Sequence, residues 1–250
     1  MLKFQTIASS SDGCCYLLQG GGASAPLLIE AGVSIKQIRA GLDAAGVGLM
    51  DLAGAVVSHR HLDHCRAAKD LNVACVDVWA SQPTIEAVRS DRPHRMHELR
   101  AQSWAAIGDW QVWPFEIEHD VEGAFGLVVA SPMGQRLLYL TDSCYTRYVI
   151  PGITHFAVEC NHSEAILRAN VEEGIIDGSR FARTSRTHMS LERLCGMLDA
   201  WDLSSARQIY LLHLSSTNSD ASAFKQHIEG RYGIPCEVAP EVGAMVGGAR

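Results

Sequence analysis

The stretch that decides the fold is AGAVVSHRHLDH, residues 53–64. Its first six residues are short, apolar and rich in β-branched side chains, which predicts a buried strand. Four polar residues follow at close spacing: His59, His61, Asp63 and His64. Two histidines at i and i+2 can extend from one loop toward one place, and imidazole and carboxylate groups suit Zn²⁺ and also Mn²⁺. The stretch therefore predicts a metal site at the carboxyl end of a strand.

Four residues cannot surround two ions, and three further candidate ligands each follow an apolar run. His119 follows QVWPFEIE, Asp142 follows RLLYLT and His213 follows QIYLL. Strand carboxyl ends are where α/β sheets collect their functional groups. Taken singly, His119 and His213 could be surface turns and Asp142 a helix N-cap. Together with residues 59–64 in the same chain, they favour the metal site.

The rest of the chain alternates strand and helix patterns without an obvious linker or repeat. Residues 90–103 are polar and are interpreted as a surface excursion. Strands are predicted at 15–18, 27–30, 53–58, 73–80, 111–118, 124–130, 136–141, 156–159 and 208–212, and helices at 34–45, 63–71, 82–89, 162–173, 189–200 and 220–230. This order predicts one α/β domain over residues 1–250, a four-layer αββα sandwich of two mixed β-sheets flanked by helices.

Composition narrows the class of protein. The chain has 250 residues, 47% of them hydrophobic, which is enough for a full core. No apolar run is long enough to cross a membrane. The eight cysteines form no CxxC pair, which indicates reduced thiols and a cytoplasmic protein. A net charge of −7 argues against a broad nucleic-acid-binding surface but allows a local basic patch.

At this point the residues resemble a known family. HRHLDH is similar to the HxHxDH signature of metallo-β-lactamase-fold hydrolases, and the later histidines and aspartate follow in the order of that family's metal motifs. IASSSDGCCYLL, LLIEAG, VECNH, RTHMS and LLHLSSTNS resemble segments of its YycJ/WalJ-type branch, which is described as DNA exonucleases. The chain departs from that pattern at Cys14 in place of Asn, Glu30 in place of Asp and Thr187 in place of Gly.

The resemblance implies a site with two divalent metal ions, zinc or, as the alternative, manganese. His59, His61 and His119 would bind the first ion, Asp63, His64 and His213 the second, and Asp142 would bridge them. A hydroxide shared by the two ions would attack the substrate, with Asp63 orienting it. His188 matches a motif that contacts the scissile phosphate in related nucleases. The interval from Asp142 to His213 is too short for a β-CASP insertion.

Three arginines precede His188 in GSRFARTSRTHMS: Arg180, Arg183 and Arg186. The planar guanidinium group suits phosphate, so this segment is a candidate substrate-binding edge. The alternative is a solvated helix face. Glu159 and Asp120 are candidates for orienting the imidazole rings, with a structural role at a turn as the alternative for each.

These residues favour a metal-dependent phosphodiesterase or nuclease that acts on DNA or another nucleic acid. The alternative is a small-molecule hydrolase of the lactonase, β-lactamase or thioesterase type, because one scaffold accommodates many substrates. A third possibility is a non-catalytic binding module that keeps its metal for stability. Neither the oligomeric state nor the choice among DNA, RNA and cyclic nucleotides follows from the sequence.

Overall fold

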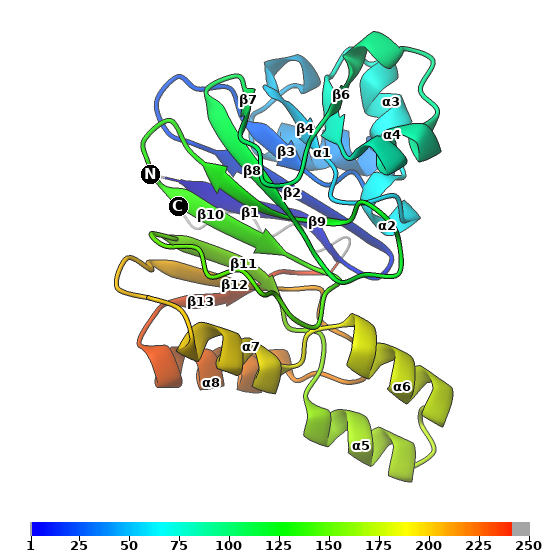
Figure 1. Cartoon of the computed structure of the whole chain (residues 1–250), viewed down its shortest axis with the longest axis vertical. Coiled ribbons are helices and arrows are strands. Elements are labelled where there is room, and N and C mark those ends of the chain that lie inside the picture. The colour runs from blue at the N-terminus through cyan, green and yellow to red at the C-terminus, as the bar shows by residue number, and fades with distance from the viewer. Residues whose placement is uncertain (1, 242–250) are drawn as a thin grey trace. The chain divides into compact units, whose positions relative to one another are not determined.

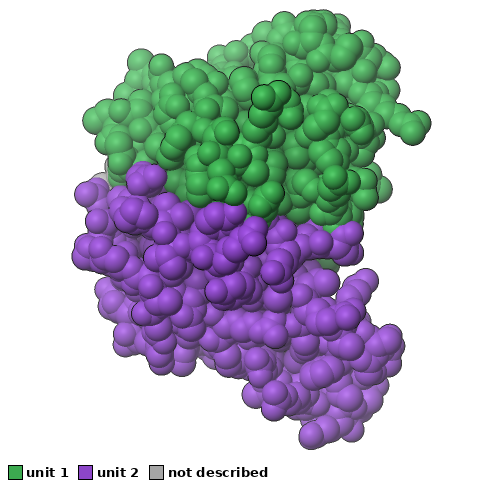
Figure 2. Space-filling model, viewed as in Figure 1, with its two compact units in different colours: residues 1–116, 121–135, 240–250 green, residues 117–120, 136–239 purple. Residues whose placement is uncertain are grey.

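The computed structural model describes residues 2–241, so the predicted domain range of 1–250 extends beyond the described residues. The chain divides into two compact units (Figure 2). Unit 1 runs through residue 116 and includes 121–135, and unit 2 contains 117–120 and 136–239. The expectation of a single domain stays a prediction. Among the described helices, none is long and apolar enough to cross a bilayer.

Unit 1 contains a six-stranded mixed sheet (Figure 1). Its first three strands, β1 (Lys3–Ser10), β2 (Gly13–Gln19) and β3 (Leu27–Ile29), are antiparallel neighbours, and the strands from β3 onward are parallel. Strands β2, β3 and β4 are almost wholly buried, which is why the sequence reads as continuous apolar runs there. In spatial order the strands are β1 (Lys3–Ser10), β2 (Gly13–Gln19), β3 (Leu27–Ile29), β4 (Gly54–Val56), β5 (Val78–Ala80) and β6 (Met96–Glu98).

The first helix of unit 1 begins where the sequence indicates. Ser34 is the N-cap of α1 (Ile35–Ala44), and it forms a capping box with Gln37. Ile38 and Leu42 are buried on one face of this helix and belong to the hydrophobic core. Burial of such a side chain contributes about 1.5–3 kcal/mol, so this face secures the helix to the sheet.

The single helix predicted at 63–71 is wrong. The segment forms two short helices, α2 (Leu62–Cys65) and α3 (Ala68–Val73). The backbone N–H of Ala67 donates to the carbonyl of Ala31 at 2.8 Å, outside the helix. Gly32 approaches so closely that a Cβ atom there would lie 1.5 Å from the carbonyl oxygen of Asp63. The chain at Ala31 and Gly32 therefore interrupts the helix by docking against its turn.

Two other predictions are corrected in the segment that follows β4. The strand predicted at 73–80 shortens to β5, because Val73 ends α3 and Cys75 adopts a left-handed φ of 69°. The surface excursion predicted at 90–103 contains a 3₁₀ turn, η2 (Pro93–Arg95), and strand β6. The predicted helix at 82–89 corresponds to α4 (Gln82–Val88).

The three remaining strands of unit 1 form an antiparallel ribbon of the second mixed sheet: β7 (Ala105–Ile107), β8 (Trp110–Glu116) and β9 (Phe125–Ala130). This ribbon packs on the six-stranded sheet. Trp110 is fully buried and its indole N–H donates to the carbonyl of Ala25 at 2.8 Å. A Cβ atom on Gly54 would lie 3.2 Å from the Ile107 side chain. Two β layers therefore meet face to face within this unit.

Unit 2 contains the four parallel strands β10 (Arg136–Leu140), β11 (His155–Glu159), β12 (Gln208–Leu212) and β13 (Cys236–Val238). Three of its helices match predicted ones: α5 (Glu164–Glu172), α7 (Leu191–Asp199) and α8 (Ala221–Tyr232). Helix α6 (Gly178–Thr187) was not predicted. Because these strands are parallel, their carboxyl ends lie at one edge of the sheet.

Candidate metal centre

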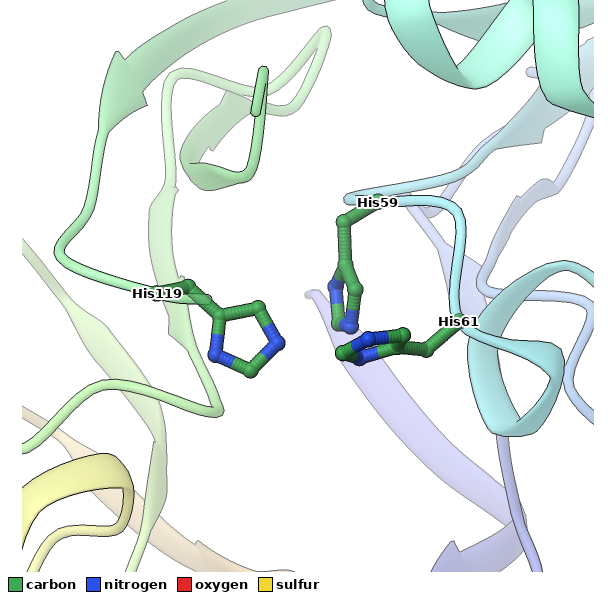
Figure 3. Close-up of side chains that lie close together, drawn as sticks. All are labelled: His59, His61 and His119. Atoms are coloured by element: carbon green, nitrogen blue, oxygen red, sulfur yellow. The ribbon is translucent and has the colours of Figure 1, made fainter. Parts of the chain in front are cut away.

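The loop after β4 brings the histidines of HRHLDH together in unit 1. The ring centroids of His59 and His61 lie 4.9 Å apart, and those of His59 and His64 lie 4.1 Å apart. Figure 3 shows the rings of His59 and His61 extending from this one loop. His64 lies in the single turn of α2 and is fully buried. The predicted position past a strand's carboxyl end is confirmed for these residues.

Two polar side chains support these rings. The Ser58 hydroxyl lies 2.9 Å from Nδ1 of His59, so Nε2 is the nitrogen of that ring suited to coordinate a metal ion. Glu30 is fully buried, and its Oε2 accepts a hydrogen bond from the Ser58 N–H at 3.2 Å. Its Oε1 lies 3.5 Å from Nδ1 of His64. Glu30 therefore orients both the loop and one imidazole. The only sequence signal for this role is the presence of an acidic residue within the apolar run LLIEAG.

The remaining side chains of this loop define its donor chemistry. Asp63 is partly exposed, with Oδ2 lying 3.5 Å from Nε2 of His64. Burial raises the pKa of the Cys65 thiol to about 11, and its Sγ donates to the carbonyl of Arg60 at 3.1 Å. Cys65 therefore stays a neutral thiol. The donors of unit 1 are imidazole nitrogens and a carboxylate.

Unit 2 forms a second cluster at the carboxyl ends of its strands. Asp142, Glu159, His188 and His213 each offer one ligand atom, and these atoms all lie within 4.8 Å of one another. They come from four separate places: just after β10, the end of β11, the C-cap of α6 and just after β12. Three of them were predicted as site residues, and Glu159 was considered only as a supporting acid.

Glu159 lies at the centre of this second cluster. It is fully buried, and its Oε1 lies 2.6 Å from Nδ1 of His188 and 3.0 Å from Nδ1 of His213. Its Oε2 accepts a hydrogen bond from the Met189 N–H at 3.3 Å. Because Nδ1 of each ring contacts this carboxylate, Nε2 is the nitrogen of each ring that can bind a metal ion or a substrate.

The same contacts shift both pKa values. Burial alone would raise the pKa of Glu159, but the neighbouring His188 and His213 hold it below its usual range. Burial alone would lower the pKa of His188, but the charge and hydrogen bond of Glu159 and the charge of Asp142 raise it to about 9. Both groups are therefore charged at neutral pH and form an ion pair.

Two residues of this cluster have a strained backbone. Asp142 has a φ of 53° and His213 a φ of 55°, in the left-handed region that residues other than glycine rarely occupy. The carbonyl of His213 accepts a hydrogen bond from the Asn161 side chain at 2.9 Å. Such strain is concentrated at functional sites, because the surrounding structure must impose it. Both side chains therefore have positions set by the fold.

The other predicted residues have different surroundings. His119 lies in the segment 117–120 of unit 2 and is labelled in Figure 3. Its Nε2 lies 3.2 Å from Oδ1 of the exposed Asp120. All three predicted arginines lie on α6 and are exposed. Among them Arg183 acts electrostatically on His188, where it lowers the pKa against the larger effects of the two acids.

Both clusters have the chemistry of a divalent metal site. Histidine nitrogens and carboxylate oxygens are the donors that Zn²⁺ binds in catalytic sites, and they also suit Mn²⁺. The supporting acids Glu30 and Glu159 are the kind of partner that orients a ligating histidine. The residues therefore fit the predicted metal ions, although they do not select one metal.

Comparison with known proteins identifies the family. Residues 27–214 match the family model of the beta-lactamase superfamily domain. The chain is 27% identical over 237 residues to the exodeoxyribonuclease YycJ of Bacillus anthracis, covering 87% of this chain and 84% of that protein. It is 24% identical over 234 residues to the exodeoxyribonuclease WalJ of Streptococcus pneumoniae, covering 87% and 83%.

A solved structure confirms the predicted fold class. The metallo-beta-lactamase fold protein YhfI from Bacillus subtilis aligns with a TM-score of 0.71 at 15% identity, over 96% of this chain and 97% of that chain. At that identity the similarity establishes the fold alone. The chain therefore belongs to the β-lactamase superfamily and is a hydrolase-type protein of the metallo-β-lactamase fold.

Proposed function

We propose that this protein is a two-metal phosphodiesterase that acts as a nuclease on DNA. The observation that carries the proposal is the cluster in unit 2, where a buried Glu159 orients His188 and His213 beside Asp142. Support for the substrate class comes from two relatives, which are both named exodeoxyribonucleases.

The proposed ligand assignment follows the family resemblance. One ion is assigned to His59, His61 and His119, and the other to Asp63, His64 and His213, with Asp142 as the bridge. Bound at such a site, two divalent cations acidify a water molecule and polarise the ester under attack. Zinc is the proposed metal and manganese the alternative.

Further roles in the reaction are proposed for Asp63, His188 and Glu159. Asp63 is the partly exposed carboxylate of its cluster, so it is proposed to accept a hydrogen bond from the attacking water. In the metal-free protein the charges of Glu159 and Asp142 raise the pKa of His188 to about 9, so His188 is proposed to act as a protonated imidazole. A cationic ring can donate a hydrogen bond to a phosphate oxygen and stabilise the charge that develops there. Glu159 keeps that ring in place.

The arginines of α6 are proposed to extend the phosphate-binding edge. Arg183 is the best placed of the three, because its charge already acts on His188. Arg180 and Arg186 lie on the same exposed helix. Guanidinium groups at such an edge bind the phosphates on either side of the scissile bond and contribute more to affinity than to the chemical step.

The second candidate is a small-molecule hydrolase of the lactonase, β-lactamase or thioesterase type. The net charge of −7 favours it, since a nuclease gains from a positive surface. The metal chemistry would be the same in both cases. A cytoplasmic location stays a prediction under either candidate.

A short substrate panel tests the proposal. Metal-loaded protein is given a single-stranded and a double-stranded oligonucleotide, bis(p-nitrophenyl) phosphate, a lactone and nitrocefin. The proposal predicts metal-dependent cleavage of the phosphodiesters at rates above those of the other esters and amides. Hydrolysis of the lactone or nitrocefin far faster than of any phosphodiester would replace it with the second candidate. Well-folded, metal-loaded protein that cleaves no phosphodiester would overturn it.

A further inference from the structure

We propose that Asn161 is a positioning residue for His213, and that it acts by holding the backbone of this histidine in its left-handed conformation. This role rests on the proposed function, because it takes His213 as a ligand of a divalent ion. Asn161 lies two residues after Glu159, just past the end of β11, and is only 8% exposed. The residues that carry this role all lie within unit 2.

Asn161 connects the two segments that carry the histidines of the second cluster. Its backbone N–H donates to the carbonyl of Met189, the residue after His188, at 2.9 Å. Its backbone carbonyl accepts a hydrogen bond from the N–H of Ser215 at 2.9 Å. Its side-chain Nδ2 donates to the carbonyl of His213, also at 2.9 Å. Asn161 therefore holds the backbone of both segments, and its side chain is bonded to His213 itself.

Glu159 and Asn161 hold these segments at different points. Glu159 contacts the rings, with its Oε1 lying 2.6 Å from Nδ1 of His188 and 3.0 Å from Nδ1 of His213. Asn161 contacts the peptide backbone instead. A ligating nitrogen has a fixed direction only when both its ring and the backbone that carries the ring are fixed. The carboxylate therefore sets the rotation of the His213 ring, and Asn161 sets the position from which that ring extends.

The backbone of His213 needs such a partner. Its φ of 55° lies in the left-handed region, where the Cβ atom of a residue other than glycine causes strain. The strain at one such residue is similar in size to the contribution of one buried hydrogen bond. Loss of the bond from Asn161 would therefore allow the backbone to relax toward a negative φ. Because a change in φ turns the Cα–Cβ bond, the ring of His213 would then lose its contact with Glu159.

A second buried asparagine provides a matched comparison. Asn170 on α5 is also 8% exposed, and its Nδ2 donates to the carbonyl of Thr217 at 3.0 Å and to Oδ1 of Asn218 at 2.8 Å. It therefore holds a later part of the same loop after β12. A purely structural contribution to this loop belongs to both asparagines, whereas a contribution to metal binding belongs to Asn161, which is bonded to the ligand.

Metal titration of the stripped Asn161→Ala and Asn170→Ala proteins tests this role. Competition with a chromogenic chelator measures the affinity for Zn²⁺ and needs neither substrate nor turnover. In Asn161→Ala one of two equivalents should bind about tenfold more weakly, which corresponds to ~1.4 kcal/mol. In Asn170→Ala both equivalents should bind as in the wild type. Wild-type affinity in Asn161→Ala, or equal weakening in the two variants, would overturn the role.

Thermal unfolding of the metal-stripped proteins separates positioning from stability. Asn170→Ala should lower Tm at least as far as Asn161→Ala, because the Asn170 side chain donates to two acceptors and the Asn161 side chain to one. A weaker metal affinity in Asn161→Ala therefore cannot be ascribed to lower stability. If the weakening instead followed the fall in Tm across both variants, the role would be rejected.

A milder pair of variants keeps the test valid if Asn161→Ala does not fold. Serine keeps a hydroxyl donor on a shorter side chain, so Asn161→Ser should bind the weakened equivalent more tightly than Asn161→Ala and less tightly than the wild type. Asn170→Ser should bind both equivalents as the wild type does. Zn²⁺ affinity in Asn161→Ser that is no lower than in Asn170→Ser would contradict the role.

Substitution with Co²⁺ gives a spectroscopic signature, because the visible absorption of this ion depends on the geometry of its ligands. Asn161→Ala should change the absorption of one of two bound Co²⁺ ions, and Asn170→Ala should change neither. Identical spectra in Asn161→Ala and the wild type would show that His213 keeps its direction without Asn161.

Failure of the proposed function has a different signature. Wild-type protein that binds two ions but cleaves no phosphodiester would reject the proposed function and leave the role of Asn161 standing. Wild-type protein that cleaves phosphodiesters, together with Asn161→Ala protein of unchanged metal affinity and Co²⁺ spectrum, would reject the role of Asn161 alone. Wild-type protein that binds no divalent ion would reject both.

Discussion

The two clusters of histidines and acids are built in different ways. In unit 1 the candidate ligands come from six consecutive residues, and ring contacts among His59, His61 and His64 fix their arrangement. In unit 2 they come from four separate segments, and the buried Glu159 orients two rings at once. The first cluster depends on the conformation of one loop, and the second on the register of parallel strands and on one carboxylate. Substitution of a single supporting acid should therefore reduce metal affinity more in unit 2 than in unit 1.

The largest effect is expected from Asp142→Ala, because the proposed assignment makes Asp142 the bridging ligand. Loss of several kcal/mol of metal-derived stabilisation corresponds to about a thousandfold lower kcat/KM. Hydrolysis of bis(p-nitrophenyl) phosphate, measured alongside the bound metal, checks this. The matched control is Glu172→Ala, which removes an exposed carboxylate from α5 in the same unit. A variant at Asp142 with near-normal turnover would exclude the bridging role.

The supporting acids give the most direct comparison of the two clusters. Substitution of a residue that orients a metal ligand typically weakens metal affinity by about 10-fold to 100-fold. Glu159→Gln should lie near the upper end of this range, at ~100-fold, and Glu30→Gln near the lower end, at ~10-fold. The reason is that Glu159 contacts two imidazoles, whereas Glu30 lies near one. Competition with a chromogenic chelator measures both, with thermal unfolding as the control for folding. An equal or larger loss in Glu30→Gln would reverse the comparison.

The ion pair in unit 2 predicts a pH dependence of stability in metal-stripped protein. The folded-state pKa of His188 is about 9, above the ordinary histidine value of ~6.5 in the unfolded chain. A raised pKa stabilises the fold below pH ~6.5, and this contribution is lost as the pH rises through about 9. Tm should therefore fall by a few degrees across this window, at ~2–4 °C for each kcal/mol.

His188→Gln supplies the control for that pH dependence. This variant cannot carry the charge, so its Tm should be flatter between pH 6.5 and about 9 than that of the wild type. Parallel curves for the two proteins would show that the His188–Glu159 pair does not contribute to stability.

The smallest effect is expected on the exposed helix α6. Arg183→Gln should raise KM for an oligonucleotide a few-fold and leave kcat unchanged, since exposed charge contacts contribute only ~0.2–1 kcal/mol. Arg180→Gln is the matched comparison. It should change KM less, because Arg183 is the arginine whose charge lowers the pKa of His188. KM should also become less sensitive to salt in the Arg183 variant. A fall in kcat alone would move Arg183 from substrate binding to the chemical step.

The same contrast explains what the sequence could predict. The sequence predicts the ligands of HRHLDH because they lie close together in one segment. It predicts Asp142 and His213 because each follows an apolar strand. The pairing of Glu159 with Leu212 across β11 and β12, which brings Glu159 to His213, depends on strand register and has no local signal. The left-handed backbone at Asp142 and His213 is equally invisible, since only the folded sheet edge imposes it.

Two further differences from the predicted elements have separate causes. Helix α6 has the sequence GSRFARTSRT, which lacks a regular apolar stripe, so hydrophobic periodicity does not predict this helix. The break between α2 and α3 arises from Ala31 and Gly32, residues distant in sequence that dock against the turn. Tertiary contacts therefore decide the break between α2 and α3, and hydrophobic periodicity carries no information about such contacts.

The central claim is that hydrolysis by this protein depends on two divalent ions bound by the proposed ligands. Titration of metal-stripped protein with Zn²⁺, and separately with Mn²⁺, tests it most directly when hydrolysis of bis(p-nitrophenyl) phosphate is followed at each addition. We predict that turnover rises until two equivalents are bound for each chain and then stays constant. Full turnover at one equivalent, turnover in the presence of excess chelator, or two bound equivalents without any turnover would contradict the claim.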